Sequence, residues 1–232
     1  MCTLTYLPRA NGFVLTSSRD ELPKRVATPP SDYEYEGKKL VFPKDKFSQG
    51  SWLVSNDRGR VSSLLNGGLQ PHQRRDSYRK SRGIVHLDLY LFSGLEEFSR
   101  DYNLNDIEPF TIVSVEGSQI IQLVWTGSEK LLDQFDGRKP KIWSSSMLYD
   151  SEMKKMREIW FAEWLNSNTE LGRERMMDFH QQSFTDDPRC DVIMQRETGV
   201  RTTSITQIIS SGEGIEYFHY QVDEDRVVRR VR

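Results

Sequence analysis

The sequence predicts an α+β fold, with β-hairpins at both ends of the chain and helices in the middle. Segments rich in β-branched and aromatic residues, separated by turn signals, occur near both termini. Apolar residues recur at helical spacing between Gly83 and Tyr102 and again between Asp150 and Asn166. No repeat, low-complexity segment or linker interrupts the chain, so we expect residues 1–232 to form a single domain.

The first twenty residues predict a β-hairpin that turns at Asn11-Gly12, a strong hairpin signal. The segments on either side of this turn are rich in residues that favour strands. Counting outward from the turn, the numbers of paired residues sum to about 21. This register places Cys2 beside Arg19 and Asp20.

The remaining elements follow from the same two periodicities. Residues 22–48 contain four prolines and little periodicity, so we expect an irregular surface loop there. Lys130–Met147 fits neither periodicity. We expect hairpins at 51–65, 110–126 and 215–231, strands at 191–196 and 202–209, and helical segments at 83–102, 150–166 and 171–181.

The composition is that of a chain that forms a hydrophobic core. Apolar residues make up 36% and charged residues 28%, and 32 Lys and Arg face 34 Asp and Glu, for a net charge of −2. Nucleic-acid-binding proteins usually carry a basic excess, so the balance argues against that class. No apolar run reaches the roughly 18 residues that span a bilayer, and the N-terminus does not resemble a signal peptide. We therefore expect a cytoplasmic protein without a transmembrane segment.

Cys2 is the residue whose position most strongly indicates chemistry. The other cysteine is Cys190, and two cysteines exclude both a disulfide framework and a cysteine-only metal site. The four histidines lack metal-ligand spacing, so we expect no metal. If Met1 is removed, Cys2 carries a thiol beside an α-amine of pKa roughly 7.7–8.0, which can accept the thiol proton without a histidine. A small buried residue at the start of a strand is the alternative explanation of Cys2.

Three further residues extend the candidate site. Arg19 would lower the pKa of the thiol by its charge, and Asp20 would accept a hydrogen bond from the α-ammonium group. Asn66, which precedes two glycines at the end of a strand, would direct its amide at a developing oxyanion. The alternative explanation of Arg19 and Asp20 is an ordinary exposed charge pair. The alternative explanation of Asn66 is a turn residue in the left-handed conformation.

A series of short motifs, taken in order, resembles the NRDE family, also called the transport and Golgi organisation family. The motifs follow the family's order over essentially the whole chain. They are Met1-Cys2, Ser18-Arg19-Asp20-Glu21, Gly50-Ser51-Trp52, Leu64-Leu65-Asn66, Ser81-Arg82-Gly83 and Gly199-Val200-Arg201-Thr202-Thr203-Ser204.

This resemblance implies a four-layer αββα sandwich of two antiparallel sheets, similar to that of the N-terminal nucleophile hydrolases. It further implies a likeness to cysteine-type acylases, which cleave linear C–N amide bonds. On this basis Cys2 matches the nucleophile, Arg19 the arginine that contacts the thiol, and Asp20 the aspartate near the α-amine. Asn66 matches the oxyanion asparagine, and Arg201 matches an arginine late in the chain.

The sequence also departs from the family pattern. Ser18 replaces the first asparagine of the Asn-Arg-Asp-Glu motif, and Ser144-Ser145 falls where the acylases carry a second asparagine near the oxyanion. The loss of one oxyanion donor typically costs about 10²–10³ in rate.

Three functions stay open. The first is a cysteine amidohydrolase that needs no cofactor and cleaves a C–N amide bond of a small molecule. The second is a non-catalytic carrier of a haem-like or lipid ligand in the same pocket, since the family is linked to secretory organisation and to haem or lipid handling. The third is a scaffold that binds anionic lipid through the basic stretch Arg74–Arg82. Neither the substrate nor the oligomeric state follows from the sequence.

Overall fold

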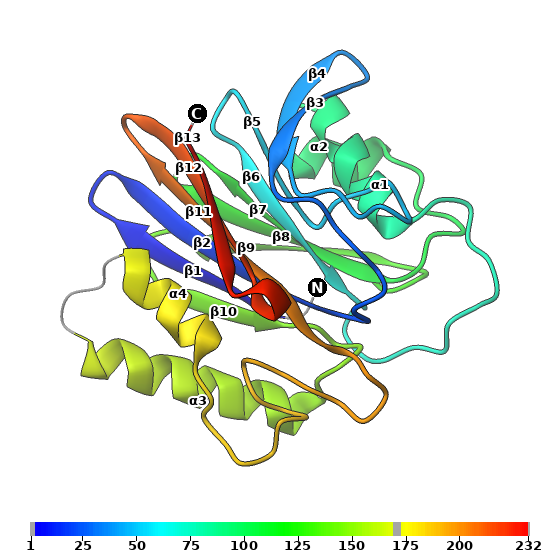
Figure 1. Cartoon of the computed structure of the whole chain (residues 1–232). Helices are drawn as coiled ribbons and strands as arrows, with labels where there is room; N and C mark the ends of the chain where they lie inside the picture. The colour runs from blue at the N-terminus through cyan, green and yellow to red at the C-terminus, as the bar shows by residue number, and fades with distance from the viewer. Residues whose placement is uncertain (1–2, 169–172, 232) are drawn as a thin grey trace. The chain divides into compact units, whose positions relative to one another are not determined.

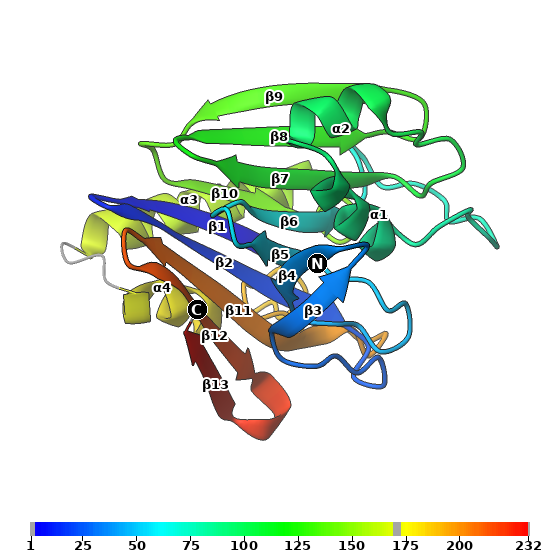
Figure 2. The same cartoon turned by 90° about the horizontal axis from the view of Figure 1, so that it is seen from above.

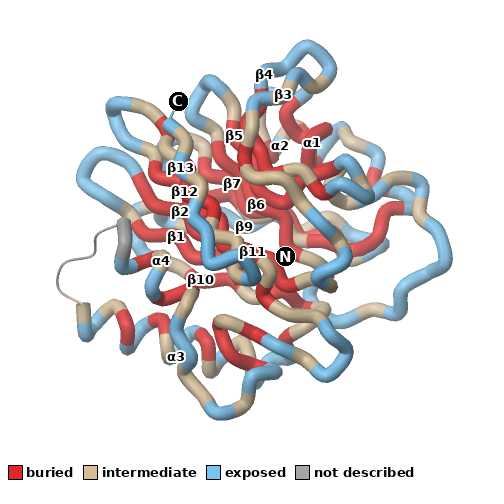
Figure 3. The backbone as a smooth tube through the Cα atoms, viewed as in Figure 1, coloured by how far each residue is buried: buried red, intermediate tan, exposed pale blue. Residues whose placement is uncertain are grey.

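The computed structural model describes residues 3–168 and 173–231, which divide into two compact units. The first unit draws on residues up to 24, 139–144 and residues from 148 onward, and the second on 25–138 and 145–147. In the described residues each unit contains one antiparallel sheet with helices packed on it, which confirms the α+β class (Figure 1). Figure 3 shows that buried residues concentrate in the strands, whereas the hairpin tips are exposed. That residues 1–232 form a single domain stays a prediction.

The first unit holds a six-stranded sheet with the strand order β10-β1-β2-β11-β12-β13. Its strands are β1 (Thr3–Arg9), β2 (Gly12–Glu21), β10 (Lys141–Ser144), β11 (Arg201–Ser211), β12 (Gly214–Gln221) and β13 (Arg226–Val231), with the 3₁₀ turn η2 (Val222–Glu224) between the last two. The hairpin expected at 215–231 is confirmed as β12–β13, which lies at one edge of this sheet.

The β1–β2 hairpin has the register that the sequence predicts. Thr3 pairs with Ser18 and Arg9 pairs with Gly12, so the paired numbers sum to 21. The turn requires a glycine because Gly12 has a φ of +130° and lies against β11. A Cβ atom at this position would lie 2.0 Å from the carbonyl oxygen of Ser210.

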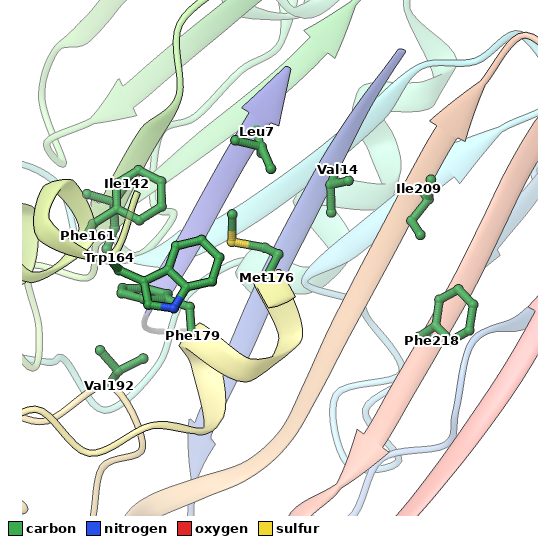
Figure 4. Close-up of a cluster of buried hydrophobic side chains, with 10 residues drawn as sticks. All are labelled: Leu7, Val14, Ile142, Phe161, Trp164, Met176, Phe179, Val192, Ile209 and Phe218. Carbon is green, nitrogen blue, oxygen red and sulfur yellow. The ribbon is translucent and has the colours of Figure 1, made fainter. Parts of the chain in front are cut away.

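Two helices, α3 (Ser151–Ser167) and α4 (Arg173–Gln181), pack on one face of this sheet. The Asp150 side chain caps α3 by accepting a hydrogen bond from the backbone N–H of Met153 at 2.9 Å. Figure 4 shows the apolar cluster that joins the helices to the sheet. Its buried members are Leu7, Val14, Ile142, Phe161, Trp164, Met176, Phe179, Val192, Ile209 and Phe218.

The second unit holds a seven-stranded sheet whose strands follow the chain from β3 to β9 (Figure 2). Its strands are β3 (Ser31–Tyr35), β4 (Lys38–Phe42), β5 (Leu53–Asn56), β6 (Val61–Asn66), β7 (Phe110–Glu116), β8 (Gln119–Trp125) and β9 (Lys130–Asp136). The helices are α1 (Arg82–Asp88), the 3₁₀ turn η1 (Leu89–Leu91) and α2 (Leu95–Asp101). Gly94 precedes α2, so the helical segment expected at 83–102 is interrupted there.

The irregular loop expected over residues 22–48 is wrong in part, because β3 and β4 form a hairpin within it. The turn lies at Glu36 and Gly37, whose φ angles are +47° and +76°. Charged residues occupy the exposed positions of β3, which lowers the apparent strand propensity of the segment. Lys130–Met147 contributes one strand to each sheet.

The strand expected at 191–196 is also wrong. The Asp191 carboxylate accepts hydrogen bonds from the backbone N–H groups of Phe184 and Val192 at 3.0 and 2.7 Å. These local bonds favour an irregular turn over strand pairing.

Two of the family-like motifs meet in the second unit. Gly50 packs directly on Gly83, and a Cβ atom on Gly50 would lie 2.4 Å from the carbonyl carbon of Gly83. The backbone N–H of Ser51 donates to the Gly83 carbonyl at 3.2 Å, and the Ser81 side chain caps α1 at Ile84. These motifs therefore serve packing and helix initiation.

Among the helices of the described residues, none has the length and apolar content needed to cross a membrane.

Candidate functional site

The candidate site in the first unit is built around the end of β2. Cys2, the predicted nucleophile, lies outside the described residues. The next residue, Thr3, pairs with Ser18, and Arg19 and Asp20 follow Ser18 along β2. Successive strand residues point to opposite faces of a sheet, so the side chains of Arg19 and Asp20 lie on opposite faces and contact different residues. Both side chains are buried, which excludes an ordinary exposed charge pair.

Two hydroxyl groups hold the Asp20 carboxylate. The Tyr149 hydroxyl donates to Oδ2 at 2.9 Å, and the Thr202 hydroxyl donates to Oδ1 at 2.7 Å. The Thr202 oxygen also accepts from the backbone N–H of Met194 at 2.9 Å. A carboxylate has about four acceptor positions, so one held in this way can still orient an ammonium group.

A buried arginine, Arg157, packs against the tyrosine that binds the Asp20 carboxylate. The guanidinium carbon of Arg157 lies 3.9 Å from the centroid of the Tyr149 ring, a cation–π geometry. Arg157 donates to the Thr3 hydroxyl at 2.8 Å and to the Asp191 carbonyl at 3.0 and 3.1 Å. It therefore connects α3 to the residue that follows the proposed nucleophile and to the tyrosine that holds Asp20.

His180 forms a second buried polar group on this face of the sheet. Its Nδ1 lies 2.7 Å from the Ser18 hydroxyl, and its Nε2 lies 2.8 Å from the Thr5 hydroxyl. Burial, followed by the charge of Arg157, lowers the pKa of His180 to about 3, so the imidazole is neutral. Ser18, which departs from the family motif, is thus used in binding this histidine.

Arg19 is positioned by a bulge in the neighbouring strand. The β2–β11 register shifts between Thr202 and Ser204, which leaves Thr203 as the extra residue. The Thr203 hydroxyl donates to the Arg19 carbonyl at 3.0 Å and accepts from the Arg19 guanidinium at 3.2 Å. Burial, followed by the charge of Arg19, lowers the pKa of His219 to about 4.

Arg201 lies at the same end of the sheet but makes different contacts. It pairs with Glu21 in the β2–β11 register, one residue beyond the pairing of Thr202 with Asp20. Its guanidinium forms an ion pair with Asp223 at 2.9 Å and is partly exposed. The structure thus brings Arg19, Asp20 and Arg201 to one end of β2 and β11.

Asn66 is the last residue of β6 in the second unit. Its carbonyl accepts a hydrogen bond from the Ser145 hydroxyl at 2.7 Å, and the Gly68 carbonyl accepts from Ser146 at 2.5 Å. The intervening Gly67 has a φ of +88°, which favours glycine. Ser145, in the position where a second oxyanion asparagine is expected, therefore holds the backbone of Asn66.

Basic residues of the stretch Arg74–Arg82 form ion pairs and hydrogen bonds within the protein. Arg75 contacts the Asp106 carboxylate and Lys80 contacts the Asp88 carboxylate, each at 2.7 Å. Arg79 donates to backbone carbonyls at Asn103 and Asn105. In the part of the chain that the structure describes, no group of three His, Cys, Asp or Glu side chains is placed to hold a metal ion.

Comparison with known proteins identifies the family. The sequence profile of the family described as Transport and Golgi organisation 2 matches residues 1–217. The chain belongs to this family. The resemblance drawn from the ordered motifs is therefore confirmed. No curated protein matches the sequence.

The chain is similar in fold to solved N-terminal nucleophile hydrolases. A cysteine-to-alanine mutant of the conjugated bile acid hydrolase from Clostridium perfringens matches with a TM-score of 0.58 and 11% identity, covering 100% of this chain and 92% of that one. An arginine-to-leucine variant of the same enzyme matches with a TM-score of 0.55 and 11% identity over 99% and 92% of the two chains.

An N-acylethanolamine-hydrolyzing acid amidase orthologue from Caenorhabditis elegans matches with a TM-score of 0.50 and 12% identity over 90% and 92% of the two chains. At these identities the likeness concerns the fold alone. It confirms the fold that the family resemblance implies, with two antiparallel sheets and few helices.

Sequence reasoning missed four residues of the candidate site. They are Tyr149, Arg157, Thr202 as the Asp20 donor, and Thr203 as the bulge residue. Helical spacing gave a signal for Arg157, since it places this residue on the buried face of α3 near Phe161 and Trp164. Thr202 and Thr203 lie in the motif Gly199–Ser204, but the motif does not indicate their partners. The other three depend on pairings between distant segments.

Proposed function

We propose that this chain is a cysteine amidohydrolase that uses Cys2, after removal of Met1, to cleave a linear C–N amide bond. The single observation that carries the proposal is the Asp20 carboxylate, buried and held by Tyr149 and Thr202 at the end of the strand that pairs with Thr3. The proposal places the α-amine of Cys2, the residue before Thr3, beside this carboxylate.

Each proposed catalytic group has a distinct role. The α-amine of Cys2 accepts the thiol proton, and the thiolate attacks the substrate carbonyl carbon. Asp20 orients the resulting ammonium group, and the charge of Arg19 lowers the pKa of the thiol. The ammonium then protonates the leaving nitrogen as the C–N bond breaks, leaving a thioester on Cys2. Water, deprotonated by the amine, attacks this thioester and releases the carboxylic acid and the thiol.

Asn66 is proposed as the side-chain donor to the oxyanion of each tetrahedral intermediate. The Ser145 hydroxyl supports this role indirectly, since it holds the Asn66 carbonyl and thereby the end of β6. A serine at this position does not supply a second amide, so we expect turnover about 10²–10³ slower than that of an enzyme with both donors. Arg201, held by Asp223, is assigned to substrate positioning.

The proposed substrate class rests on the proposed reaction and is suggested by the structural neighbours. Their names describe hydrolysis of conjugated bile acids and of N-acylethanolamines. We assign a small-molecule acyl amide to this chain, with no cofactor and no nucleic-acid partner. The scarcity of cysteines supports a cytoplasmic location for this activity.

The intact mass of the protein from its native host tests the proposal most directly. We expect a chain that begins at Cys2 and a single thiol that iodoacetamide labels near neutral pH. A Cys190→Ala variant is the matched control, because it removes the other cysteine, which is buried. Asp20→Asn in that background should slow the labelling.

Retention of Met1 in the native host would contradict the proposed base. A saturable Soret shift on titration with hemin, in a protein that labels poorly at Cys2, would favour the carrier function instead.

A further inference from the structure

The most exposed large apolar side chain of the described residues lies on a loop of the second unit. Phe47 is 88% exposed, on the segment between β4 and β5. Val26, which is 51% exposed, lies on the neighbouring segment, where its carbonyl accepts from the backbone N–H of Lys46 at 3.0 Å. The two apolar side chains therefore belong to one surface feature.

This loop is ordered by a buried carboxylate. Asp45 Oδ1 accepts from the backbone N–H groups of Phe47 and Ser48 at 3.0 and 2.8 Å, and Oδ2 accepts from Arg25 at 2.8 Å. The backbone N–H of Gln49 donates to the Asp45 carbonyl at 2.9 Å. Single exposed apolar residues are common on protein surfaces. Phe47 differs from such scattered residues because a hydrogen-bonded turn orders its backbone while its side chain stays exposed to solvent.

Basic residues adjoin the exposed ring, although Arg25 is paired with Asp45 and the Lys44 ammonium lies 4.4 Å from the Tyr33 ring centroid. The guanidinium carbon of Arg25 lies 6.0 Å from the Phe47 ring centroid, and Lys44 and Lys46 flank the turn. Three cations and the single carboxylate of Asp45 give this feature a net charge of +2. An apolar side chain among basic residues is typical of segments that lie in the interface of an anionic bilayer.

We propose that the Phe47 tip, defined as Arg25, Val26, Lys44, Lys46 and Phe47, docks the protein on an anionic lipid surface. The ring enters the boundary between headgroups and acyl chains, and the cations contact lipid phosphates. This inference goes beyond the proposed hydrolase function and does not depend on it.

A lipid surface fits the tip better than a protein partner does. A protein interface buries its central anchors within a broad complementary patch of several hundred square ångströms on each side. The tip exposes only two apolar side chains, Val26 and Phe47, in a polar setting. Insertion into acyl chains needs no such complementary surface, and the positive charge matches the phosphates.

Cosedimentation of the full chain with vesicles tests the proposal. The vesicles contain either phosphatidylcholine alone or phosphatidylcholine with about one third phosphatidylserine, which supplies the negative surface potential. We expect binding to the anionic vesicles that weakens as salt increases. Phe47→Ser should reduce partitioning about 10- to 100-fold, and Lys46→Gln about fivefold.

Leu69→Ser is the matched control, because Leu69 is 59% exposed in the same unit but lies outside the tip. It should bind like the unaltered chain. A Phe47→Trp variant should retain binding and become quenched by brominated lipid. Thermal unfolding shows whether each variant remains folded.

The proposal is overturned if the unaltered chain stays in the supernatant with anionic vesicles, or if Phe47→Ser binds as well as Leu69→Ser. Self-association that Phe47→Ser abolishes, without vesicle binding, would assign the tip to a second copy of the chain and would equally overturn the lipid proposal.

Discussion

The hydroxyl of Tyr149 lies 2.9 Å from the carboxylate of Asp20, although the two residues are 129 positions apart in the sequence. Both are buried, and the face of the Tyr149 ring carries the Arg157 guanidinium. The Asp20 carboxylate is therefore held by Tyr149, and Tyr149 is in turn held by the guanidinium of Arg157. This relationship makes the site sensitive to substitutions that do not touch a substrate.

Tyr149→Phe should lower the free energy of unfolding by about 1.5–3 kcal/mol, because it removes a hydrogen bond to a buried charged group. Tyr220→Phe is the matched control, since Tyr220 donates to an exposed carboxylate, Asp225, at the same distance of 2.9 Å. Its effect should be below about 0.5 kcal/mol. Urea unfolding of the two variants measures the difference. Equal effects would mean that the buried bond adds no more stability than the exposed one.

Arg157→Met should destabilise the protein by about 2–4 kcal/mol, because the Asp191 carbonyl and the Thr3 hydroxyl lose their buried donor. Arg138→Met, at a highly exposed arginine, is the control and should change stability by less than about 0.5 kcal/mol. Urea unfolding measures both. Arg157→Met should also raise the pKa of His180, because the charge of Arg157 is one cause of its lowering. An unchanged stability would show that Arg157 is dispensable for holding β1.

Acid should destabilise the protein through its buried histidines. The pKa of His180 falls from 6.5 in the unfolded chain to about 3 in the folded one. The unfolded chain therefore binds more protons between these values, so stability is full above pH 6.5 and falls as the pH falls through this window. His180→Gln should remove up to about 1.4 kcal/mol per pH unit from that slope.

Urea unfolding at about pH 7.5 and about pH 5 measures the slope. His86 and His219, each with a pKa lowered to about 4 mainly by burial, should sustain the remaining acid dependence. Identical slopes for the unaltered chain and His180→Gln would contradict the buried neutral state of this histidine.

Gly50→Ala should disrupt the second unit, because its Cβ atom would lie 2.4 Å from the backbone of Gly83. The backbone cannot yield as a flexible side chain can, so we expect a loss of about 3 kcal/mol or more. Gly212→Ala is the matched control, since a Cβ at Gly212 meets no atom within 4 Å. Thermal unfolding compares the two. A Gly50→Ala protein as stable as Gly212→Ala would show that the two motifs can move apart.

The parts of the fold that depend on local chemistry could be predicted from the sequence. The turn at Asn11-Gly12 determined the β1–β2 register, and helical spacing located α3. The hairpin at Ser31–Phe42 was missed because its exposed charged residues lower the apparent strand propensity of the segment. The strand expected at 191–196 is wrong because the Asp191 carboxylate accepts hydrogen bonds from nearby backbone N–H groups. Only in the second segment do polar side chains compete with strand pairing.

The sequence by itself determined the family, the α+β class and the adjacency of Arg19 and Asp20 at the end of a predicted strand, because short motifs and turn residues act over a few positions. Only the tertiary structure decided what holds these charges. Thr202 reaches Asp20 across 182 residues, Thr203 reaches Arg19 through a bulge, and Arg157 is brought to Thr3 when α3 packs on the sheet. Such contacts depend on strand pairing and helix packing between distant segments, and no local pattern encodes them.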